Sequence, residues 1–214
     1  MTGKGRVPKS SAIVAYVLAG GGSTRFGRDK ALAEIDGKPM LTRMCELLAG
    51  VTSKVHVVAA PSKYVSLGIE TVADCWPGEG PLGGIITALQ HTAADDPWCQ
   101  WNLMVSCDMP FLTREWIDFL ARCASRSEAQ VVLPRSQHGL EPLCACYKTN
   151  AGGALRAVFE GGVRKVTQAL QQVKTEVLDE ADWKRFDSDA RLFWNMNTPV
   201  EYGEAKRILK VGRT

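Results

Sequence analysis

Three consecutive glycines followed by closely spaced cations form the stretch of this chain best suited to chemistry. An apolar run rich in β-branched residues ends at Leu18, and Ala-Gly-Gly-Gly-Ser-Thr-Arg-Phe-Gly-Arg-Asp-Lys follows. Glycine permits positive φ and leaves backbone N–H groups uncovered, so this turn can form a cradle for phosphate oxygens. The pattern predicts a polyphosphate loop after a buried strand. The residues that would form it are Gly20, Gly21, Gly22, Arg25, Arg28 and Lys30.

Two better-known glycine loops do not match this stretch. A Walker-type loop needs Lys and then Ser or Thr after its last glycine, but Arg28 and Asp29 follow Gly27. A dinucleotide fingerprint needs a third glycine where this chain has Arg25, whose side chain would obstruct close packing. A plain strand-to-helix turn with surface cations nearby is the structural alternative.

A candidate metal ligand stands at the end of another apolar run. Asp108 follows Asn-Leu-Met-Val-Ser-Cys and precedes Met-Pro, so its carboxylate lies where a buried strand must turn. Mg²⁺ typically takes one or two protein carboxylates together with substrate phosphates, so one aspartate facing the glycine loop can suffice. The alternative is a turn-forming aspartate near the helix start at Thr113.

Two further motifs could contact a ligand. Asp74 precedes Gly80-Pro-Leu-Gly-Gly, a tight loop before an apolar helical run, whose backbone could approach a flat base or a ribose. Asn195 and Asn197 stand at alternating positions before the last predicted helix, where both amides could face one ligand. A surface turn and ordinary turn-forming asparagines are the respective alternatives.

Covalent catalysis is not indicated by this sequence. It shows no Ser/His/Asp or Cys/His arrangement, and His56, His91 and His138 are expected to be structural or exposed. The seven cysteines form no Cys-x-x-Cys pair, which is typical of reduced thiols in the cytoplasm. Cys144 and Cys146 alternate along a predicted strand and are expected to be small core residues.

Composition and charge favour an ordinary globular protein. The 214 residues are 45% hydrophobic and 23% charged, which suits a single domain over residues 11–214 after a disordered basic tail over residues 1–10. The tail carries the whole net charge of +3, so charge does not indicate nucleic-acid binding. A signal peptide is disfavoured because its cleavage would destroy the glycine loop, and no segment reaches the ~20 apolar residues of a membrane span.

Short apolar runs alternate with helical patterns along the chain. This alternation predicts an α/β fold of three layers, in which helices cover both faces of a mainly parallel, twisted, Rossmann-like sheet. The short connection between the fifth and sixth runs predicts an antiparallel hairpin. Pro39 is expected at the first position of a helix, and Thr198, Pro199 and Glu201 predict a capped last helix. The strand candidates are 12–18, 55–60, 69–72, 102–106, 130–134, 143–147 and 175–178.

Together these motifs resemble the molybdenum cofactor guanylyltransferase family of nucleotidyltransferases. The resemblance extends in order over about residues 13–205 and includes Cys107-Asp-Met-Pro, Glu141-Pro-Leu and Asn195-Met-Asn-Thr-Pro. It implies binding of GTP and Mg²⁺ and transfer of GMP to the terminal phosphate of molybdenum-molybdopterin, with release of pyrophosphate. Proteins that insert molybdenum and chaperones of molybdoenzymes are the implied partners, with no nucleic acid or membrane.

The resemblance also assigns roles to residues. Leu18, Ala19 and Gly20 would line the nucleotide with the neighbouring glycines, and Asp74 and Gly80 would lie at the nucleoside. Lys30 and Arg25 would hold the phosphates, Asp108 would bind Mg²⁺, and Asn195 and Asn197 would face the pterin. Catalysis would then consist of positioning and charge stabilisation, since the nucleophile belongs to the substrate.

One departure from the family pattern leaves open which nucleotide base is bound. Some members end the second strand with an asparagine that reaches the nucleoside, whereas this chain reads Val57-Val-Ala-Ala-Pro. A molybdopterin cytidylyltransferase that uses CTP is therefore the nearest alternative. A sugar-1-phosphate nucleotidyltransferase and a GTP-binding sensor or cofactor chaperone without turnover are more distant ones.

Overall fold

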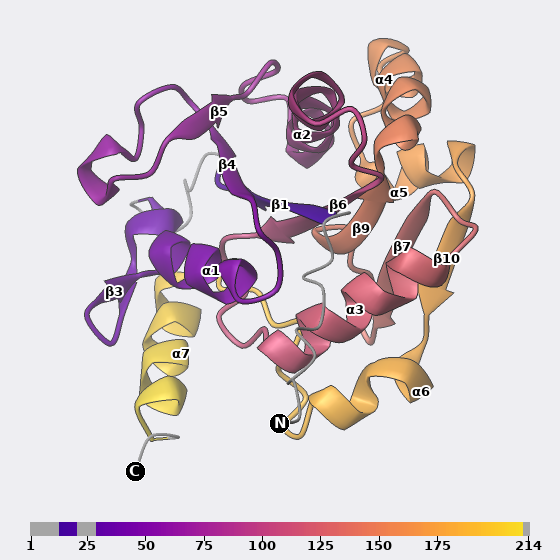
Figure 1. The fold of residues 1–214 in the computed structure, drawn as a ribbon. Coiled ribbons are helices and arrows are strands. Elements are labelled where there is room, and N and C mark those ends of the chain that lie inside the picture. The colour runs from indigo at the N-terminus through magenta and orange to yellow at the C-terminus, as the bar shows by residue number, and fades with distance from the viewer. Residues whose placement is uncertain (1–12, 21–28, 212–214) are drawn as a thin grey trace, which may run out of the picture.

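The computed structural model describes residues 13–20 and 29–211, so the expected tail over residues 1–10 lies outside the described range. Within this range the centre of the molecule is an eight-stranded sheet (Figure 1). Its strands are β1 (Ile13–Leu18), β4 (Val55–Ala59), β5 (Thr71–Ala73), β6 (Trp101–Ser106), β7 (Val131–Ser136), β8 (Gly139–Leu140), β9 (Cys144–Lys148) and β10 (Thr175–Leu178).

The strand order confirms the predicted α/β fold with a mainly parallel sheet. The order is β10-β7-β9-β6-β1-β4-β5, with β8 paired to β7. Strands β6, β1, β4 and β5 run parallel, as do β10 and β7. Strand β9 is antiparallel to both β6 and β7, which confirms the predicted antiparallel pair. Crossover connections therefore bring the carboxyl ends of the parallel strands to one edge.

Helices cover both faces of the sheet, because each buried strand alternates its side chains between two cores. In β1, Ala15 and Val17 face one core, while Tyr16 and Leu18 face the other. Helices α1 (Met40–Ala49), α3 (Arg114–Arg126) and α6 (Glu180–Trp183) pack on the first face. Helices α2 (Pro81–Asp95), α4 (Gly152–Glu160) and α5 (Val166–Ala169) pack on the second (Figure 1).

The two predicted core cysteines are buried on one face of β9. Cys144 and Cys146 both belong to the core beneath α3, and the intervening Ala145 belongs to the opposite core. Burial raises the pKa of the Cys144 thiol to about 12, so this thiol stays protonated at neutral pH. Both cysteines therefore act as small apolar side chains, as the alternation predicts.

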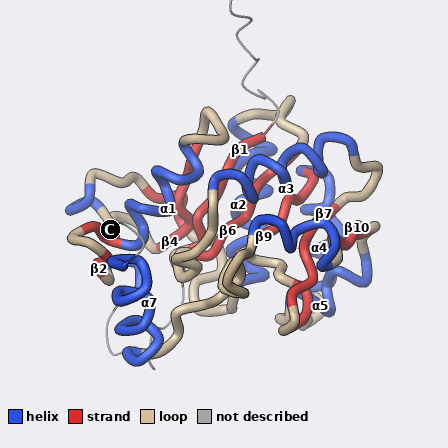
Figure 2. The backbone as a smooth tube through the Cα atoms, turned by 90° about the horizontal axis from the view of Figure 1, so that it is seen from below, coloured by secondary structure: helices blue, strands red, loops and turns tan. Residues whose placement is uncertain are grey.

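A small third core holds the last helix against the rest of the molecule. Helix α7 (Pro199–Val211) lies beside a short hairpin of β2 (Glu34–Ile35) and β3 (Lys38–Pro39) (Figure 2). Met196 and Ala205 are buried there with Ile35. Pro39 precedes α1 instead of opening it, because pairing of Pro39 with Glu34 keeps its backbone extended. None of the helices described here is long and apolar enough to span a bilayer.

Candidate active site

Several of the predicted residues meet at the carboxyl edge of the sheet. Ala19 and Gly20 follow β1, Asp74 follows β5, and Asp108 lies two residues beyond β6. Since these strands are parallel, their ends converge where ligands of α/β sheets bind. Gly21, Gly22, Arg25 and Arg28 lie outside the described residues, so their predicted contacts with phosphates stay predictions.

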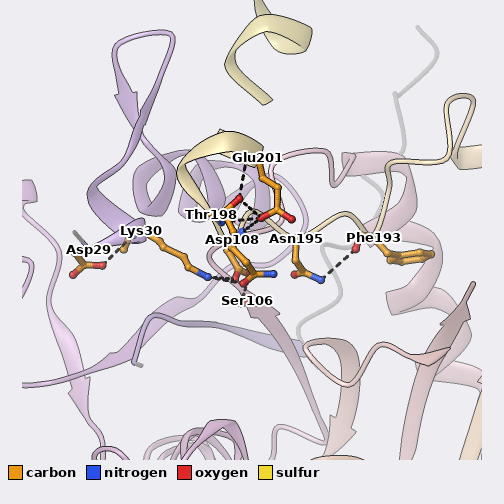
Figure 3. Close-up of polar contacts among 10 residues, drawn as sticks. Asp29, Lys30, Ser106, Asp108, Phe193, Asn195, Thr198 and Glu201 are labelled. Atoms are coloured by element: carbon orange, nitrogen blue, oxygen red, sulfur yellow. Dashed lines mark hydrogen bonds and ion pairs between the residues drawn. The ribbon is translucent and has the colours of Figure 1, made fainter. Parts of the chain in front are cut away.

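Asp108 is held from two sides. The hydroxyl of Ser106 donates to Asp108 Oδ1 at 2.6 Å, and the ammonium of Lys30 donates to Asp108 Oδ2 at 3.2 Å (Figure 3). The side chains of Lys30 and Asp108 are each only 16% exposed, so water screens their attraction weakly. The structure thus brings together the two residues that the sequence predicts for phosphate charge and metal binding.

A short 3₁₀ turn carries Lys30 to this position. The turn comprises Lys30–Leu32, and Asp29 caps it by accepting a hydrogen bond from the Ala31 amide at 3.0 Å. Ala31 is fully buried in the core that also contains Val17 and Val105, so it anchors the turn. The lysine side chain is consequently directed along the edge towards β6.

Tyr64 connects the two described ends of the glycine-rich segment. Its hydroxyl oxygen lies 3.1 Å from the carbonyl oxygen of Ala19 and 3.0 Å from Oδ2 of Asp29, so its one proton serves two acceptors. Lys63 also pairs with Asp29 at 2.9 Å. Burial and then the Asp29 charge raise the pKa of the Tyr64 phenol above its ordinary value. Sequence reasoning missed Tyr64 because no motif surrounds it.

Asp74 lies beside the two glycine-containing turns, at Gly20 and Gly80, where the sequence resemblance predicts the nucleoside. Asp74 Oδ1 accepts hydrogen bonds from the Trp76 amide at 3.0 Å and from the Thr87 hydroxyl at 3.2 Å. A Cβ added at Gly20 would lie 3.5 Å from Asp74 Oδ2, so the two predicted residues are neighbours. Gly80 has a φ of +88° and directly precedes α2, a conformation that glycine adopts without strain.

The two predicted asparagines have different environments. Asn195 Nδ2 donates to the Phe193 carbonyl at 3.3 Å, whereas Asn197 Oδ1 accepts from Lys30 Nζ at 2.6 Å. Between them, the Met196 amide donates to the Asp108 carbonyl at 2.9 Å. The segment before α7 therefore lies directly against the Lys30 and Asp108 pair. The predicted contact of either asparagine with a pterin stays a prediction.

A pocket of about 410 Å³ extends from this segment along the same edge. Phe193 and Trp194 line it beside Trp183, whose indole N–H donates to the Arg135 carbonyl at 3.0 Å. Charged and polar groups at its walls include those of Arg135, Ser136, His138, Asp179, Lys184 and Asp187. The pocket combines aromatic surface with hydrogen-bonding groups, which suits a polar ring system.

Glu141 adjoins this pocket through Ser136. Its Oε1 accepts from the hydroxyl of Ser136, a pocket residue, at 2.6 Å. The neighbouring Leu143 carbonyl accepts from the Ser106 amide at 2.8 Å. Burial raises the pKa of the Glu141 carboxyl, and the hydrogen bond from Ser136 opposes that effect. The residues at this end of the site were not predicted, apart from the Glu-Pro-Leu motif itself.

Comparison of this sequence with known proteins identifies its family and relatives. The model of the MobA-like NTP transferase domain matches residues 15–174. A Deinococcus radiodurans protein named "probable molybdenum cofactor guanylyltransferase" is 33% identical, over 90% of this chain and 93% of its own. A Syntrophotalea carbinolica protein named molybdenum cofactor guanylyltransferase is 28% identical, over 90% of each chain.

Solved structures show the same fold. The molybdopterin-guanine dinucleotide biosynthesis protein A from Archaeoglobus fulgidus superposes with a TM-score of 0.76 at 24% identity, over 92% of this chain and 98% of that one. A CMP:2-keto-3-deoxy-manno-octonic acid synthetase complexed with CTP superposes with a TM-score of 0.69 at 11% identity, over 94% of this chain and all of that one. The same fold thus occurs in proteins whose names indicate different substrates.

Proposed function

Because this chain belongs to the MobA-like NTP transferase domain family, and is a nucleotidyltransferase, we propose that it is a molybdenum cofactor guanylyltransferase. It transfers GMP from GTP to the phosphate of molybdenum-molybdopterin and releases pyrophosphate. The names of the relatives support this substrate pair. The observation that carries the proposal is the Lys30 and Asp108 pair at the edge where the glycine-rich segment begins.

The nucleotide would occupy the half of the edge formed by β1, β4 and β5. Ala19 and Gly20 offer backbone beside Asp74, and Gly80 leaves the space before α2 open. Lys30 lies between this half and Asp108, where an ammonium can neutralise phosphate charge. Leu18, just before this turn, is anchored because its side chain packs in the core beneath α2.

The donor set fits a magnesium ion that is completed by the nucleotide. Mg²⁺ prefers oxygen ligands and usually keeps several waters or phosphate oxygens. The described residues contain no group of three or more acidic, histidine or cysteine side chains around Asp108, so phosphates would supply the other ligands. Asp108 would hold the ion through its carboxylate. A bound Mg²⁺ would withdraw charge from the phosphates and so stabilise the leaving pyrophosphate.

The chain's own residues would act by positioning and charge. In the reaction, an oxygen of the acceptor phosphate forms a bond to the α-phosphorus while the bond between that phosphorus and the β-phosphate oxygen breaks. The electron pair of the broken bond leaves with pyrophosphate. Lys30 would stabilise the negative charge that grows on the phosphate oxygens, and low exposure makes this attraction stronger. No enzyme nucleophile is required.

The acceptor would extend in the other direction, into the pocket at the end of β7. A phosphate placed near Lys30 and Asp108 leaves the rest of the acceptor beside Asn195, and Phe193 and Trp194 continue from there into the pocket. A pterin is flat and rich in hydrogen-bonding groups, as these walls require. Proteins that insert molybdenum or carry the product remain predicted partners.

The test compares two nucleotides on one acceptor. The protein is incubated with Mg²⁺, molybdenum-loaded molybdopterin, and either GTP or CTP, and the dinucleotide and pyrophosphate are quantified. We expect product with GTP. Product with CTP alone would instead identify a cytidylyltransferase. This alternative stays open because the end of β4 carries no asparagine that could reach the base. GTP binding without pyrophosphate release would instead indicate a sensor or chaperone.

A further inference from the structure

The ammonium of Lys30 donates to oxygens of Asp108 and Asn197, which come from distant parts of the chain. Oδ2 of Asp108 lies 3.2 Å away, and the amide oxygen of Asn197 lies closer, at 2.6 Å. One partner is a carboxylate that the proposed reaction assigns to a cation. The other is a neutral amide, which holds an ammonium without cancelling its charge.

The backbone around Asn197 is fixed on both sides. Its own amide donates to Glu201 Oε2 at 2.7 Å, and the same oxygen accepts from the Thr198 amide at 2.8 Å and from the Thr198 hydroxyl at 3.0 Å. On the other side, Met196 is fully buried and its amide is bonded to the Asp108 carbonyl. The backbone on both sides of Asn197 is therefore held in place while its side-chain amide oxygen accepts from Lys30.

We propose that Asn197 is a positioning residue for Lys30. It keeps the ammonium beside the phosphates when the carboxylate of Asp108 is engaged by Mg²⁺ and nucleotide, an inference that rests on the proposed function. A lysine side chain loses rotamer entropy when it is ordered, so one fixed acceptor reduces the cost of holding it at the site. This role differs from direct contact of Asn197 with the pterin.

The consequence is a link between the two halves of the site. Phe193 and Trp194 line the pocket assigned to the acceptor, and the same segment reaches Lys30 four residues beyond Phe193 through Asn197. The segment therefore has one end at the acceptor and the other at the phosphate-binding lysine. Positioning of Lys30 then depends on the segment that the acceptor contacts.

A double-mutant cycle tests this role. Asn197→Ala and Lys30→Met are made singly and together, and GTP affinity is measured by calorimetry with Mg²⁺ and without acceptor, so that no turnover occurs. We expect Asn197→Ala to weaken GTP binding by about fivefold when Lys30 is present and by less than about twofold in the Lys30→Met background. Non-additivity of this kind is expected only if Asn197 acts through Lys30.

Turnover provides the second readout. With acceptor present, Asn197→Ala should lower kcat by about tenfold and leave the KM for the acceptor within about twofold. Asn150→Ala is the matched control, because Asn150 is exposed near the start of β6, at the opposite edge of the sheet, and it should change neither value. Thermal unfolding of each variant verifies the fold.

Two results would overturn the inference. Equal effects of Asn197→Ala in both lysine backgrounds, or unchanged GTP affinity with a raised acceptor KM, would assign Asn197 to the acceptor instead. Failure of the proposed function is separate. If the unmodified protein binds GTP but makes no guanine dinucleotide, the reaction is wrong, while the calorimetric cycle still decides whether Asn197 positions Lys30.

Discussion

The hydroxyl of Ser106 donates a 2.6 Å hydrogen bond to Oδ1 of Asp108. Ser106 is the last residue of β6 and Asp108 lies two residues further on, so this bond joins the end of the strand to the turn that follows it. This bond orients the carboxylate before any ligand arrives, and it leaves Oδ2 directed towards Lys30. A preoriented carboxylate loses little freedom when it binds a cation.

Asp108→Asn tests the carboxylate itself. The amide has nearly the same shape but no charge, so we expect Mg²⁺-dependent kcat to fall by about a hundredfold or more, while the fold is retained. The measurement is pyrophosphate release over a range of Mg²⁺ concentrations. Asp118→Asn, on α3, controls for charge change alone and should keep full activity. Unimpaired turnover of Asp108→Asn would refute the metal role.

Tyr64→Phe tests the connection between Ala19 and Asp29. The change removes only the hydroxyl, and a hydrogen bond to a charged group contributes about 1.5 kcal/mol, so we expect the KM for GTP to rise by about tenfold. Tyr16→Phe is the matched control, because that buried hydroxyl bonds Thr92 beneath α2. Both variants should lose stability, but only Tyr64→Phe should change the KM. An equal KM for GTP in the two variants would exclude a role of the Tyr64 hydroxyl in GTP binding.

Glu201→Ala tests the cap of α7. The Glu201 amide donates to the Thr198 hydroxyl at 3.2 Å, and the Glu201 carboxylate accepts from the Thr198 amide, which completes the predicted capping box. Its loss should lower the free energy of unfolding by about 1 kcal/mol, measured by urea denaturation. Glu204→Ala, an exposed change in the same helix, should stay within about 0.5 kcal/mol. Equal effects would mean that the cap contributes no stability.

A hydrogen-bond relay lies beneath α2, at the opposite side of β1 from Lys30. Thr92 donates its hydroxyl proton to Asn102 Oδ1, so it must accept from Tyr16 at 2.6 Å. The Tyr16 oxygen must then accept from His91 Nδ1 at 2.8 Å. The ring of His56 lies 4.7 Å from that of His91, centroid to centroid, and stacks on Tyr16.

His56 should make stability depend on pH. Burial lowers the pKa of His56 below 6.5, the charge of His91 and that of Lys54 lower it further, and Asp95 opposes them. Below pH 6.5 the unfolded chain therefore binds the proton more readily, and stability falls as the pH falls towards the folded-state pKa. Urea denaturation at pH values of about 7.5 and 5.5 should show a smaller fall for His56→Phe than for the unmodified protein. His138→Phe, in the exposed β7–β8 turn, should retain the full fall.

The main strands and the central pair of the site could be predicted because both follow local rules. Observed strands β4 and β6 differ by one residue from their predicted ranges, since apolar runs of this length are buried wherever they pair. Lys30 and Asp108 meet because parallel strands end at one edge. Tyr64 and the Asn197 contact could not be predicted, since each depends on side-chain packing between segments without a shared motif.

Short pairings explain the remaining differences. The hairpin of β2 and β3 has only two residues in each strand, too few for a visible alternation, and it changes the role of Pro39 from first helical residue to the residue before the helix. The pocket at the end of β7 is formed by residues from two segments, 135–138 and 179–194, so its volume follows only from their packing.

The contact between Lys30 and Asn197 joins residues that are 167 positions apart. During synthesis, the lysine emerges with the first strand, while its partner follows only after the sheet is complete. A nascent or truncated chain that ends before the closing segment would contain the residues of every strand from β1 to β10 and the Lys30 and Asp108 pair, but it would lack the amide that holds the ammonium. We therefore expect the full catalytic rate only after the last segment has been made.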